Sequence, residues 1–365
     1  MTKQSKTFTP DWVSPPGDTI LDLLEERGWN QVEFASRTGY TTKHISLLIN
    51  GKAAITEDTA LKLERVLGSP ASFWLTREAQ YREALARAEE RISLAAFADW
   101  LKEIPVRDMI KFGWIRHFAD KGEMVAECLR FFGVASVSAW ENEYGKPMAA
   151  YRSSEKFAKH SGAVSAWLRE GERQAGLIQC KPYDKAGFKE SIVRLRALTN
   201  EPNPDIFIPK LMETCSAVGV AVVVAPAPKG CPVSGATQWL GQDKALLMLS
   251  LRHKTNDHFW FSLFHEAGHL LLHGKRLLFI DVEGDLGNDH EDQANVFASD
   301  VLISPSASRA LRLLPANAES IRSFAAQYDI APGIVLGRLQ KEGRLPWQSI
   351  LNKSLKTRYV WAHEG

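Results

Sequence analysis

Residues 259–273 read FWFSLFHEAGHLLLH, and the interpretation of the whole chain starts from this stretch. His265 and His269 are four residues apart in an apolar run that predicts a helix, so both imidazoles lie on one face and can bind one metal ion. Glu266 lies on the neighbouring edge of that helix, where it can act as general base on an activated water. The spacing therefore predicts metal-assisted peptide hydrolysis, with His265 and His269 as metal ligands and Glu266 as the catalytic residue.

A catalytic zinc site usually has three protein ligands and one open position. Glu291 and Asn295 are four residues apart in a second helical pattern, so we expect Glu291 to be the third ligand and Asn295 to hydrogen-bond a ligand histidine. His273 is a poor third ligand because eight residues separate it from His265, which is about 12 Å along a helix that rises ~1.5 Å per residue. The alternatives for the third ligand are Asp285, Asp289 and His290.

Two questions about this site stay open in the sequence. The ligand set suits Zn²⁺, and it also suits Mn²⁺. Hydrolysis further needs a donor that stabilises the oxyanion, and the sequence does not choose among the candidates Arg252, His253 and Arg338.

The surroundings of the motif predict an α+β domain over residues 205–348. Apolar runs at 218–224 and 245–250 predict two buried strands. Helices are expected at 291–303 and 318–328, and the motif helix is expected to be capped by Asn256 or Asp257. Prolines 202, 204 and 209 mark the start of this domain, and residues 349–365 are expected to form a C-terminal tail.

The N-terminal part predicts an all-helical domain over residues 14–78, after a flexible lead at 1–13. One helix is expected from about residue 15 to Gly28, two short helices follow that break at Gly39, and another runs over 56–67. Asn30 and Thr41 suit the N-caps of the two short helices. Short helices that meet at a glycine-containing turn are typical of the helix-turn-helix motif. Residues 79–200 predict a helical middle region without a chemical motif.

In a helix-turn-helix the second helix enters the major groove of DNA. The residues expected to face the bases are Thr42, Lys43, His44 and Ser46. The residues expected to contact phosphates are Arg37, Thr41 and Lys52. Residues 1–90 contain 11 Lys and Arg against 13 Asp and Glu, a net charge of −2, which counts against DNA binding, although only one face needs to be basic. The competing interpretation is a small helical protein–protein module.

Composition excludes several classes of protein. Hydrophobic residues make up 45% and charged residues 24% of the 365-residue chain, as in ordinary globular proteins, and no apolar run is long enough for a membrane span. Four widely spaced cysteines and the absence of an apolar signal core favour reduced thiols in a cytoplasmic protein. A net charge of +2 says little about partners.

Two stretches of the chain resemble known families. The segment from Pro16 to Lys52, with Ala54-Ile55-Thr56 and Phe73-Trp74-Leu75, resembles the HigA-type antitoxins of the XRE helix-turn-helix family. The segments 233–237, 259–269, 291–305 and 337–340 resemble the ImmA/IrrE metallopeptidases. Together they cover nearly the whole chain and resemble regulators in which the two modules are fused.

These resemblances imply a zincin-like zinc peptidase that cleaves a repressor, an antitoxin-like regulator or a related partner under stress. They also imply a DNA-binding domain that acts as a homodimer and autoregulates, and they support Glu291 as the third ligand. The chain departs from the family at Gln293, where an acidic residue is common just before the Ala-Asn pair. If that position supplied the ligand, the site would be impaired.

Two functions therefore compete. The first is a DNA-binding regulator whose zinc endopeptidase cuts a partner regulator or itself in a stress, toxin–antitoxin or phage-related response. The second is a HigA-like antitoxin or repressor whose metal domain is only a sensor or structural module. The presence of Glu266 favours the first, because a structural metal site does not require a base at that position.

Overall fold

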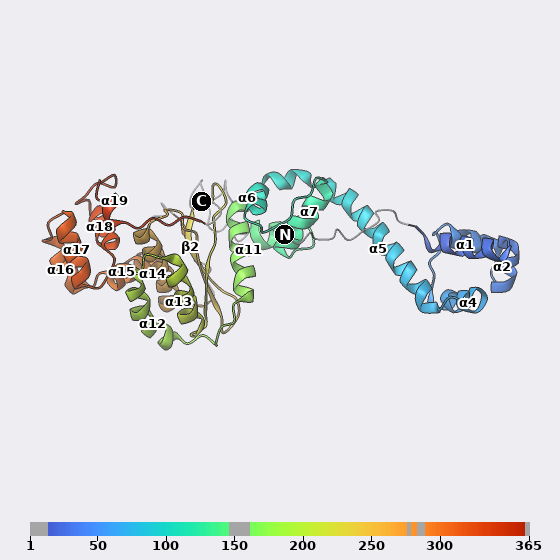
Figure 1. Ribbon diagram of the computed structural model, residues 1–365, viewed down its shortest axis with the longest axis horizontal. Coiled ribbons are helices and arrows are strands. Elements are labelled where there is room, and N and C mark those ends of the chain that lie inside the picture. The colour runs from blue at the N-terminus through green and yellow to red at the C-terminus, as the bar shows by residue number, and fades with distance from the viewer. Residues whose placement is uncertain (1–13, 146–160, 276–278, 283–288, 362–365) are drawn as a thin grey trace, which may run out of the picture. The chain divides into compact units, whose positions relative to one another are not determined.

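The computed structural model describes residues 14–145, 161–275, 279–282 and 289–361. The lead predicted at 1–13 and the candidate ligand Asp285 lie outside these residues. Contacts divide the chain into two units, Met1–Phe97 with Ala119–Ala126, and Ala98–Phe118 with Glu127–Gly365. A helical first unit and a second unit with a sheet confirm the predicted α+β class (Figure 1).

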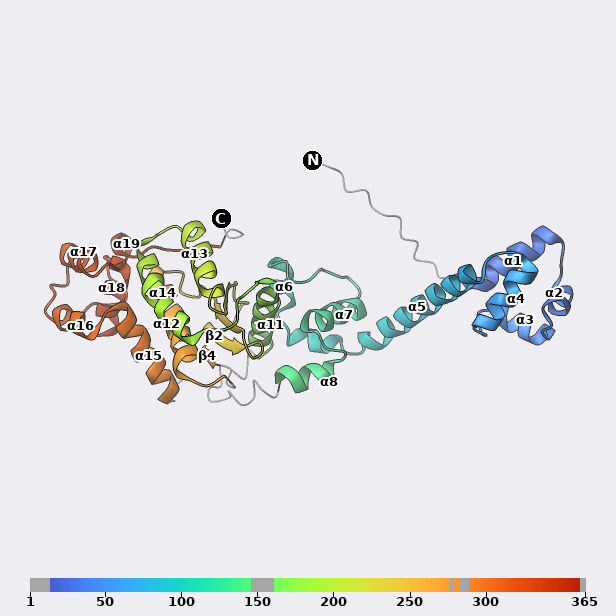
Figure 2. The ribbon, with the colours of Figure 1, turned by 90° about the horizontal axis from the view of Figure 1, so that it is seen from below.

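The first unit is a bundle of short helices joined to one long helix (Figure 2). Buried apolar side chains from each short helix form its core, which Trp74 of the long helix completes. The helices are α1 (Pro16–Arg27), α2 (Gln31–Thr38), α3 (Thr42–Ile49), α4 (Glu57–Leu67) and α5 (Ala71–Ala95).

Local capping chemistry fixes these boundaries, and the predictions for them are confirmed. The Asn30 side chain accepts hydrogen bonds from the backbone N–H groups of residues 32 and 33 at the start of α2. Thr41 accepts one from the N–H of His44 at the start of α3. Gly39 ends α2 with φ of 73°, a left-handed conformation that costs glycine little.

The chain between α5 and the sheet is helical, as predicted. Its elements are η1 (Ala98–Lys102), α6 (Val106–Lys111), α7 (Lys121–Phe132), α8 (Val137–Trp140), η2 (Glu141–Gly145), α11 (Ser161–Leu177), α12 (Lys185–Ala197), η3 (Leu198–Asn200) and α13 (Pro204–Ser216). Helix α13 runs through Pro209, so the prolines at 202–209 lie at and inside a helix.

The second unit is built on a four-stranded sheet of order β1-β3-β2-β4. The strands are β1 (Val220–Val224), β2 (Val233–Trp239), β3 (Ala245–Leu249) and β4 (Phe279–Val282). Strands β1 and β3 are parallel and fully apolar, and both were predicted. Strand β2 pairs antiparallel with β3 and with β4. The strand pattern missed β2 and β4, because the Ser, Gly and Thr residues of β2 give no continuous apolar run.

Helices cover both faces of this sheet (Figure 1). On one face lies α11, whose Trp167 donates a 3.1 Å hydrogen bond to the carbonyl of Ala225. Gly171 of the same helix packs directly on Met248 of β3. The other face packs on α12, α13 and the motif helix, in one core that includes Phe188 and Leu211. The boundary predicted at residues 200–205 therefore does not coincide with a division in packing, because α11 and α12 bury their apolar faces on the sheet.

The C-terminal helices complete this unit. They are α14 (Asn256–Leu272), α15 (Asp289–Leu302), α16 (Pro305–Arg312), α17 (Ala318–Gln327), α18 (Pro332–Lys341) and α19 (Asn352–Leu355). Helices α14, α15 and α17 match the predicted ranges closely. Pro305 follows the end of α15 and starts α16, at a position where its missing N–H costs nothing.

The predicted cap of α14 is wrong. The N-cap residue is Thr255, and Asn256 and Asp257 are the first residues of the helix. Their side chains hold the C-terminal segment instead. Asn256 Oδ1 accepts from the backbone N–H of Thr357, and Asp257 forms a buried 2.6 Å ion pair with Lys356. The segment that we expected to be a tail is thus packed on the motif helix, where Tyr359 is part of the core.

Candidate functional site

Helix α14 carries the motif residues in the interior of the second unit. His265, Glu266 and His269 are only 2%, 0% and 1% exposed. The helix is apolar on nearly all sides because it packs between the sheet, α15 and α18. The Nε2 atoms of His265 and His269 lie 3.0 Å apart, as residues one helical turn apart can.

Glu291 of α15 lies against both histidines. Its two carboxylate oxygens are 3.1 Å from His265 Nε2 and 3.3 Å from His269 Nε2. The close approach of α14 and α15 depends on Gly268, where a β-carbon would come within 3.2 Å of the Cα of Ala294. A larger residue at 268 would therefore push Glu291 away from the histidines.

Each histidine has a partner on its other ring nitrogen. His265 Nδ1 is 3.1 Å from Asn295 Oδ1, which only accepts, so Nδ1 donates there and Nε2 is the nitrogen that can bind a metal ion. His269 Nδ1 is 3.0 Å from His273 Nδ1. Partners of this kind fix the tautomer and the ring orientation of metal-binding histidines. Sequence spacing predicted that His273 lies too far along the helix from His265 to share its ion, and it missed the contact of His273 with His269.

Electrostatics keep Glu291 ionised. Burial raises the pKa of its carboxyl group, but the hydrogen bonds with His265 and His269 outweigh burial and lower the pKa to about 2. For His273, burial and the neighbouring His269 and His290 lower the pKa of the ring. Glu291 therefore offers a carboxylate, and His273 favours a neutral ring, over the physiological pH range.

The cluster has the dimensions of a metal site. One donor atom from each of His265, His269 and Glu291 lies within 4.8 Å of the others. Two ligands at ~2.0–2.1 Å from a tetrahedral zinc ion stand about 3.3 Å apart, and the observed separations of 3.0–3.3 Å are close to this value. Two imidazoles and one carboxylate with fixed orientation could therefore hold a divalent cation.

The remaining candidates lie elsewhere. Asp289 is exposed, and His290 packs its ring on His273 at 4.4 Å between centroids. Arg338 is paired with Glu342 on α18. Gln293, at the position where the family often has an acid, is exposed and is not part of the three-residue cluster.

Glu266 fits beside β2 only because residue 235 is a glycine. A β-carbon at Gly235 would stand 2.5 Å from Glu266 Oε1 and 2.7 Å from its Cγ. Gly235 has no predicted role of its own, since its contact with Glu266 joins residues 31 positions apart. A glycine inside a strand is the one available signal, because it often marks a close approach.

The helix-turn-helix surface is formed by α2 and α3. Thr42, Lys43, Ser46 and Lys52 are exposed, whereas Ile45, Leu48 and Ile49 face the core. His44 is half-buried and packs on Tyr40, with ring centroids 4.4 Å apart. The exposed set includes the two lysines and lies on the outward face of α3 and the turn that follows it.

Two residues that are predicted to contact phosphates interact with neighbours within the first unit. Arg37 forms a 2.7 Å ion pair with Glu33 and lies 4.0 Å above the ring of Trp29. The Thr41 side chain caps α3 by accepting from His44. A hydroxyl that accepts can still donate its own proton to a phosphate, whereas Arg37 would have to share its charge with Glu33.

The matches to known proteins fall separately in the two units. Residues 20–74 match the helix-turn-helix family model HTH_3. A curated protein of Escherichia coli K12, the uncharacterized HTH-type transcriptional regulator YddM, is 35% identical over 80 residues, which cover 22% of this chain and 83% of the relative.

The chain belongs to the helix-turn-helix transcriptional regulators. Residues 222–339 of this regulator match the model of the IrrE N-terminal-like domain, Peptidase_M78, so a metallopeptidase-family domain is fused to its DNA-binding module. The resemblance to a helix-turn-helix protein joined to an ImmA/IrrE-type domain is thereby confirmed. The matched segment begins in β1 and ends in α18, and it contains all the residues of the cluster described above. No helix in the described part of the regulator is long and apolar enough to cross a membrane.

Proposed function

We propose that this regulator is a metal-dependent endopeptidase whose helix-turn-helix module addresses it to DNA. The observation that carries the proposal is the convergence of His265, His269 and Glu291 from two helices, beside the buried carboxylate of Glu266. A domain of the IrrE type over residues 222–339 supports it. Asn295 and His273 would hold the two ligand imidazoles in place.

The metal is proposed to be Zn²⁺, with Mn²⁺ as the alternative. Two neutral imidazoles and a carboxylate form a ligand set of the type found in zinc peptidases, and manganese accepts the same atoms. A divalent ion held there supplies a Lewis acid that activates water and polarises a peptide carbonyl.

The chain's own residues supply the proton transfers. Glu266 takes a proton from the attacking water and returns it to the leaving amine. It follows His265 directly in the sequence and packs against Gly235 of β2, so it has little freedom to move. Of the donors considered for the oxyanion, Arg338 is paired with Glu342 and Arg252 Nη1 donates to the carbonyl of Pro232, and the choice among Arg252, His253 and Arg338 stays open.

The substrate is proposed to be a protein, either a repressor or antitoxin-like regulator or the chain itself. The fusion of a peptidase-family domain to a helix-turn-helix module supports this, because both modules then act in one regulatory circuit. The regulator is proposed to act in the cytoplasm, in a stress, toxin–antitoxin or phage-related response.

Replacement of the base tests the catalytic part. Glu266→Gln keeps the size of the buried side chain but removes the base, and we expect cleavage to fall by about 10²- to 10⁴-fold. Wild-type and variant proteins are each co-expressed with the products of the neighbouring genes, and mass spectrometry identifies new termini in those products and in the chain itself. Bound metal is measured in both, since the variant retains all three ligands.

Equal processing by the two proteins, with equal metal content, would refute the peptidase. The second candidate function would then stand, a HigA-like antitoxin or repressor whose metal domain senses or stabilises. The near-complete burial of His265 and His269 is the observation that favours this alternative, because structural metal sites are closed.

The DNA-binding part is proposed to act as a homodimer, with α3 in the major groove and Lys43 and Lys52 against DNA. Lys52→Ala, at a residue proposed to contact phosphate, should weaken binding to DNA from upstream of the chain's own gene and lower the salt slope of affinity by about 1. The matched control is Lys62→Ala on α4, where the lysine is paired with Asp58 at 2.6 Å. Equal salt slopes for Lys52→Ala and Lys62→Ala would contradict the proposed phosphate contact.

A further inference from the structure

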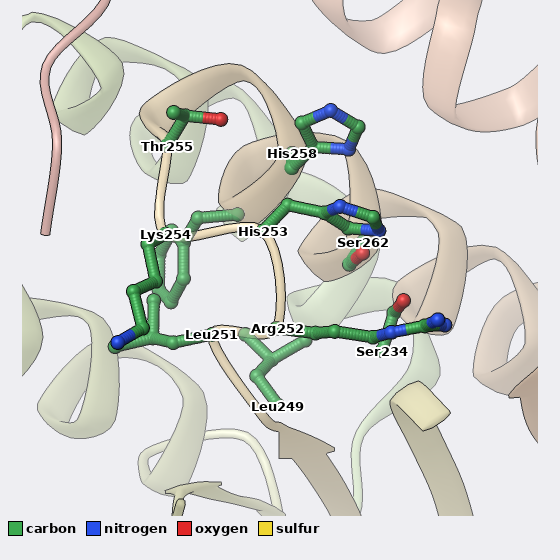
Figure 3. A pocket seen from close by; sticks show the side chains of 10 residues that line it. Ser234, Leu249, Leu251, Arg252, His253, Lys254, Thr255, His258 and Ser262 are labelled. Atoms are coloured by element: carbon green, nitrogen blue, oxygen red, sulfur yellow. The ribbon is translucent and has the colours of Figure 1, made fainter. Parts of the chain in front are cut away.

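A small hollow lies beside the first turns of α14, on the same helix as the candidate metal ligands (Figure 3). The hollow is shallow and open to solvent, so only the end of a small group can enter it. The polar residues that bear on the argument are Ser234, Arg252, His253, His258 and Ser262. None of the ten residues that line the hollow is acidic.

The backbone around the hollow is unusual at three positions. Ser234 is the extra residue of a β-bulge, because Val233 and Gly235 of β2 pair with the adjacent residues 282 and 281 of β4. Leu251 and Lys254, on the loop that leads into α14, both have φ of 55°, a left-handed conformation that is costly for residues other than glycine. Bulges and backbone strain of this kind gather at binding and catalytic sites.

Hydrogen bonds hold the loop and the bulge together. The Ser250 hydroxyl donates to the carbonyl of Val233 at 2.7 Å, and its N–H donates to the carbonyl of Ser234 at 3.0 Å. Arg252 Nη1 donates to the carbonyl of Pro232 at 2.6 Å. The strained loop and the bulge therefore form one fixed wall.

The hollow borders the candidate metal centre on two sides. Ser234 immediately precedes Gly235, which packs against Glu266. Ser262 lies one helical turn before His265, so the two side chains are neighbours on α14. Residues of the hollow are thus near neighbours, along the chain, of Gly235 and His265.

The groups that face the hollow suit an anion. The rings of His253 and His258 stack with centroids 4.2 Å apart, and Figure 3 shows the hydroxyls of Ser234 and Ser262 on the same side as these rings, whereas Lys254 extends the other way. Serine hydroxyls and imidazole N–H groups donate hydrogen bonds, and a guanidinium is always charged. The N-terminal end of α14 adds a positive partial charge.

We propose that this hollow is a substrate subsite that binds a carboxylate of the peptide to be cleaved. The carboxylate comes either from an Asp or Glu side chain near the scissile bond or from a C-terminus. The inference rests on the peptidase proposed above, and it specifies which peptides that site prefers. His253 contributes an exposed imidazole donor, and Arg252 contributes charge while its Nη1 anchors the strand.

Binding is measured on the full-length Glu266→Gln protein, so that no probe is consumed. The probes are three peptides: acetyl-Ala-Ala-Glu-Ala-Ala-amide, the same peptide with Gln for Glu, and the Gln peptide with a free C-terminal carboxylate. Dissociation constants are read from the ring signals of ¹³C-labelled histidines, with and without added Zn²⁺. We expect one of the carboxylate peptides to bind about tenfold more tightly than the neutral peptide, whether or not Zn²⁺ is present. Which of the two does so distinguishes a side-chain from a terminal carboxylate.

His253→Asn and Arg252→Gln should each reduce that ratio to about 1. The matched control is His117→Asn, which removes another exposed imidazole of the second unit and should leave the ratio unchanged. Circular dichroism verifies that each variant is folded. Equal binding of all three peptides would overturn the subsite, and so would a preference that survives in both variants or that requires Zn²⁺. Because binding is read without cleavage, this result is independent of whether the peptidase itself is active.

Discussion

Gly235 of β2 and Glu266 of α14 are in such close contact that residue 235 has room for no side chain. A β-carbon there would lie 2.5 Å from Oε1 of Glu266 and 3.0 Å from its carboxyl carbon. The position of the proposed general base is therefore set by a strand that lies 31 residues earlier in the chain.

Gly235→Ala should displace the Glu266 carboxylate and lower the rate of peptide cleavage by about 10²-fold, because a shift of about 1 Å at a reacting group costs that much. Metal content should stay the same, since the atoms nearest to the added β-carbon belong to Glu266, which is not a proposed ligand. The control is Gly176→Ala on α11, where an added β-carbon meets nothing within 4 Å. A Gly235→Ala protein with full activity and the wild-type melting temperature would show that the contact does not position the base.

Asn295→Ala should weaken metal binding by about 10- to 100-fold, because His265 loses the acceptor that fixes its ring. Affinity is measured by competition with a chromophoric chelator. Val296→Ala, at the neighbouring exposed position of α15, serves as the control and should bind metal like the wild type. Unchanged affinity in Asn295→Ala would contradict the orienting role.

Acidification should release the metal with uptake of two protons per ion between about pH 7 and pH 4. The lowered pKa of Glu291, about 2, means that its carboxylate stays ionised throughout this window and takes up no proton. The two ligand imidazoles must protonate, because a metal ligand nitrogen cannot carry a proton. A dye that reports free ion, combined with titration of the protons consumed, gives the ratio. Three protons per ion would show that Glu291 also protonates on release.

Buried thiols should resist alkylation in the folded protein. Burial raises the pKa of Cys215 and of Cys231 to about 12, so at pH 8 each holds roughly a thousandfold less thiolate than a free cysteine. Cys180 is half-buried, and its pKa is raised as well. Iodoacetamide followed by peptide mapping should find Cys180 modified first, and all four cysteines modified only after denaturation. Early modification of Cys215 would contradict its burial.

Local chemistry explains why the first unit was predictable. The side chains of Asn30 and Thr41 cap the helices that they immediately precede, and Gly39 ends the helix next to it. These interactions span three residues or fewer, so the sequence pattern contains both partners. The buried strands β1 and β3 were predictable for a similar reason, because each is a continuous apolar run.

Long-range packing explains the structural features that the sequence pattern did not predict. Strand β2 is polar in part, and only its pairing with β3 and β4 makes it a strand. Asn256 and Asp257 have side chains suited to capping, but they bind residues about 100 positions later in the chain. Prolines 202–209 look like a linker, yet the helix that contains Pro209 buries Phe207 and Leu211 in the core.

The sequence by itself determined the helix-turn-helix boundaries and the pairing of His265 with His269 on one helical face, because both follow from residues within a turn of one another. Only the tertiary structure brings Glu291 to 3.1 Å from His265 and leaves Asp289 exposed, which supports Glu291 as the proposed third ligand. It also decided the place of Gly235 beside Glu266. Both outcomes depend on how closely α14 approaches α15 and β2, and that spacing is set by side-chain volumes in a core assembled from distant parts of the chain.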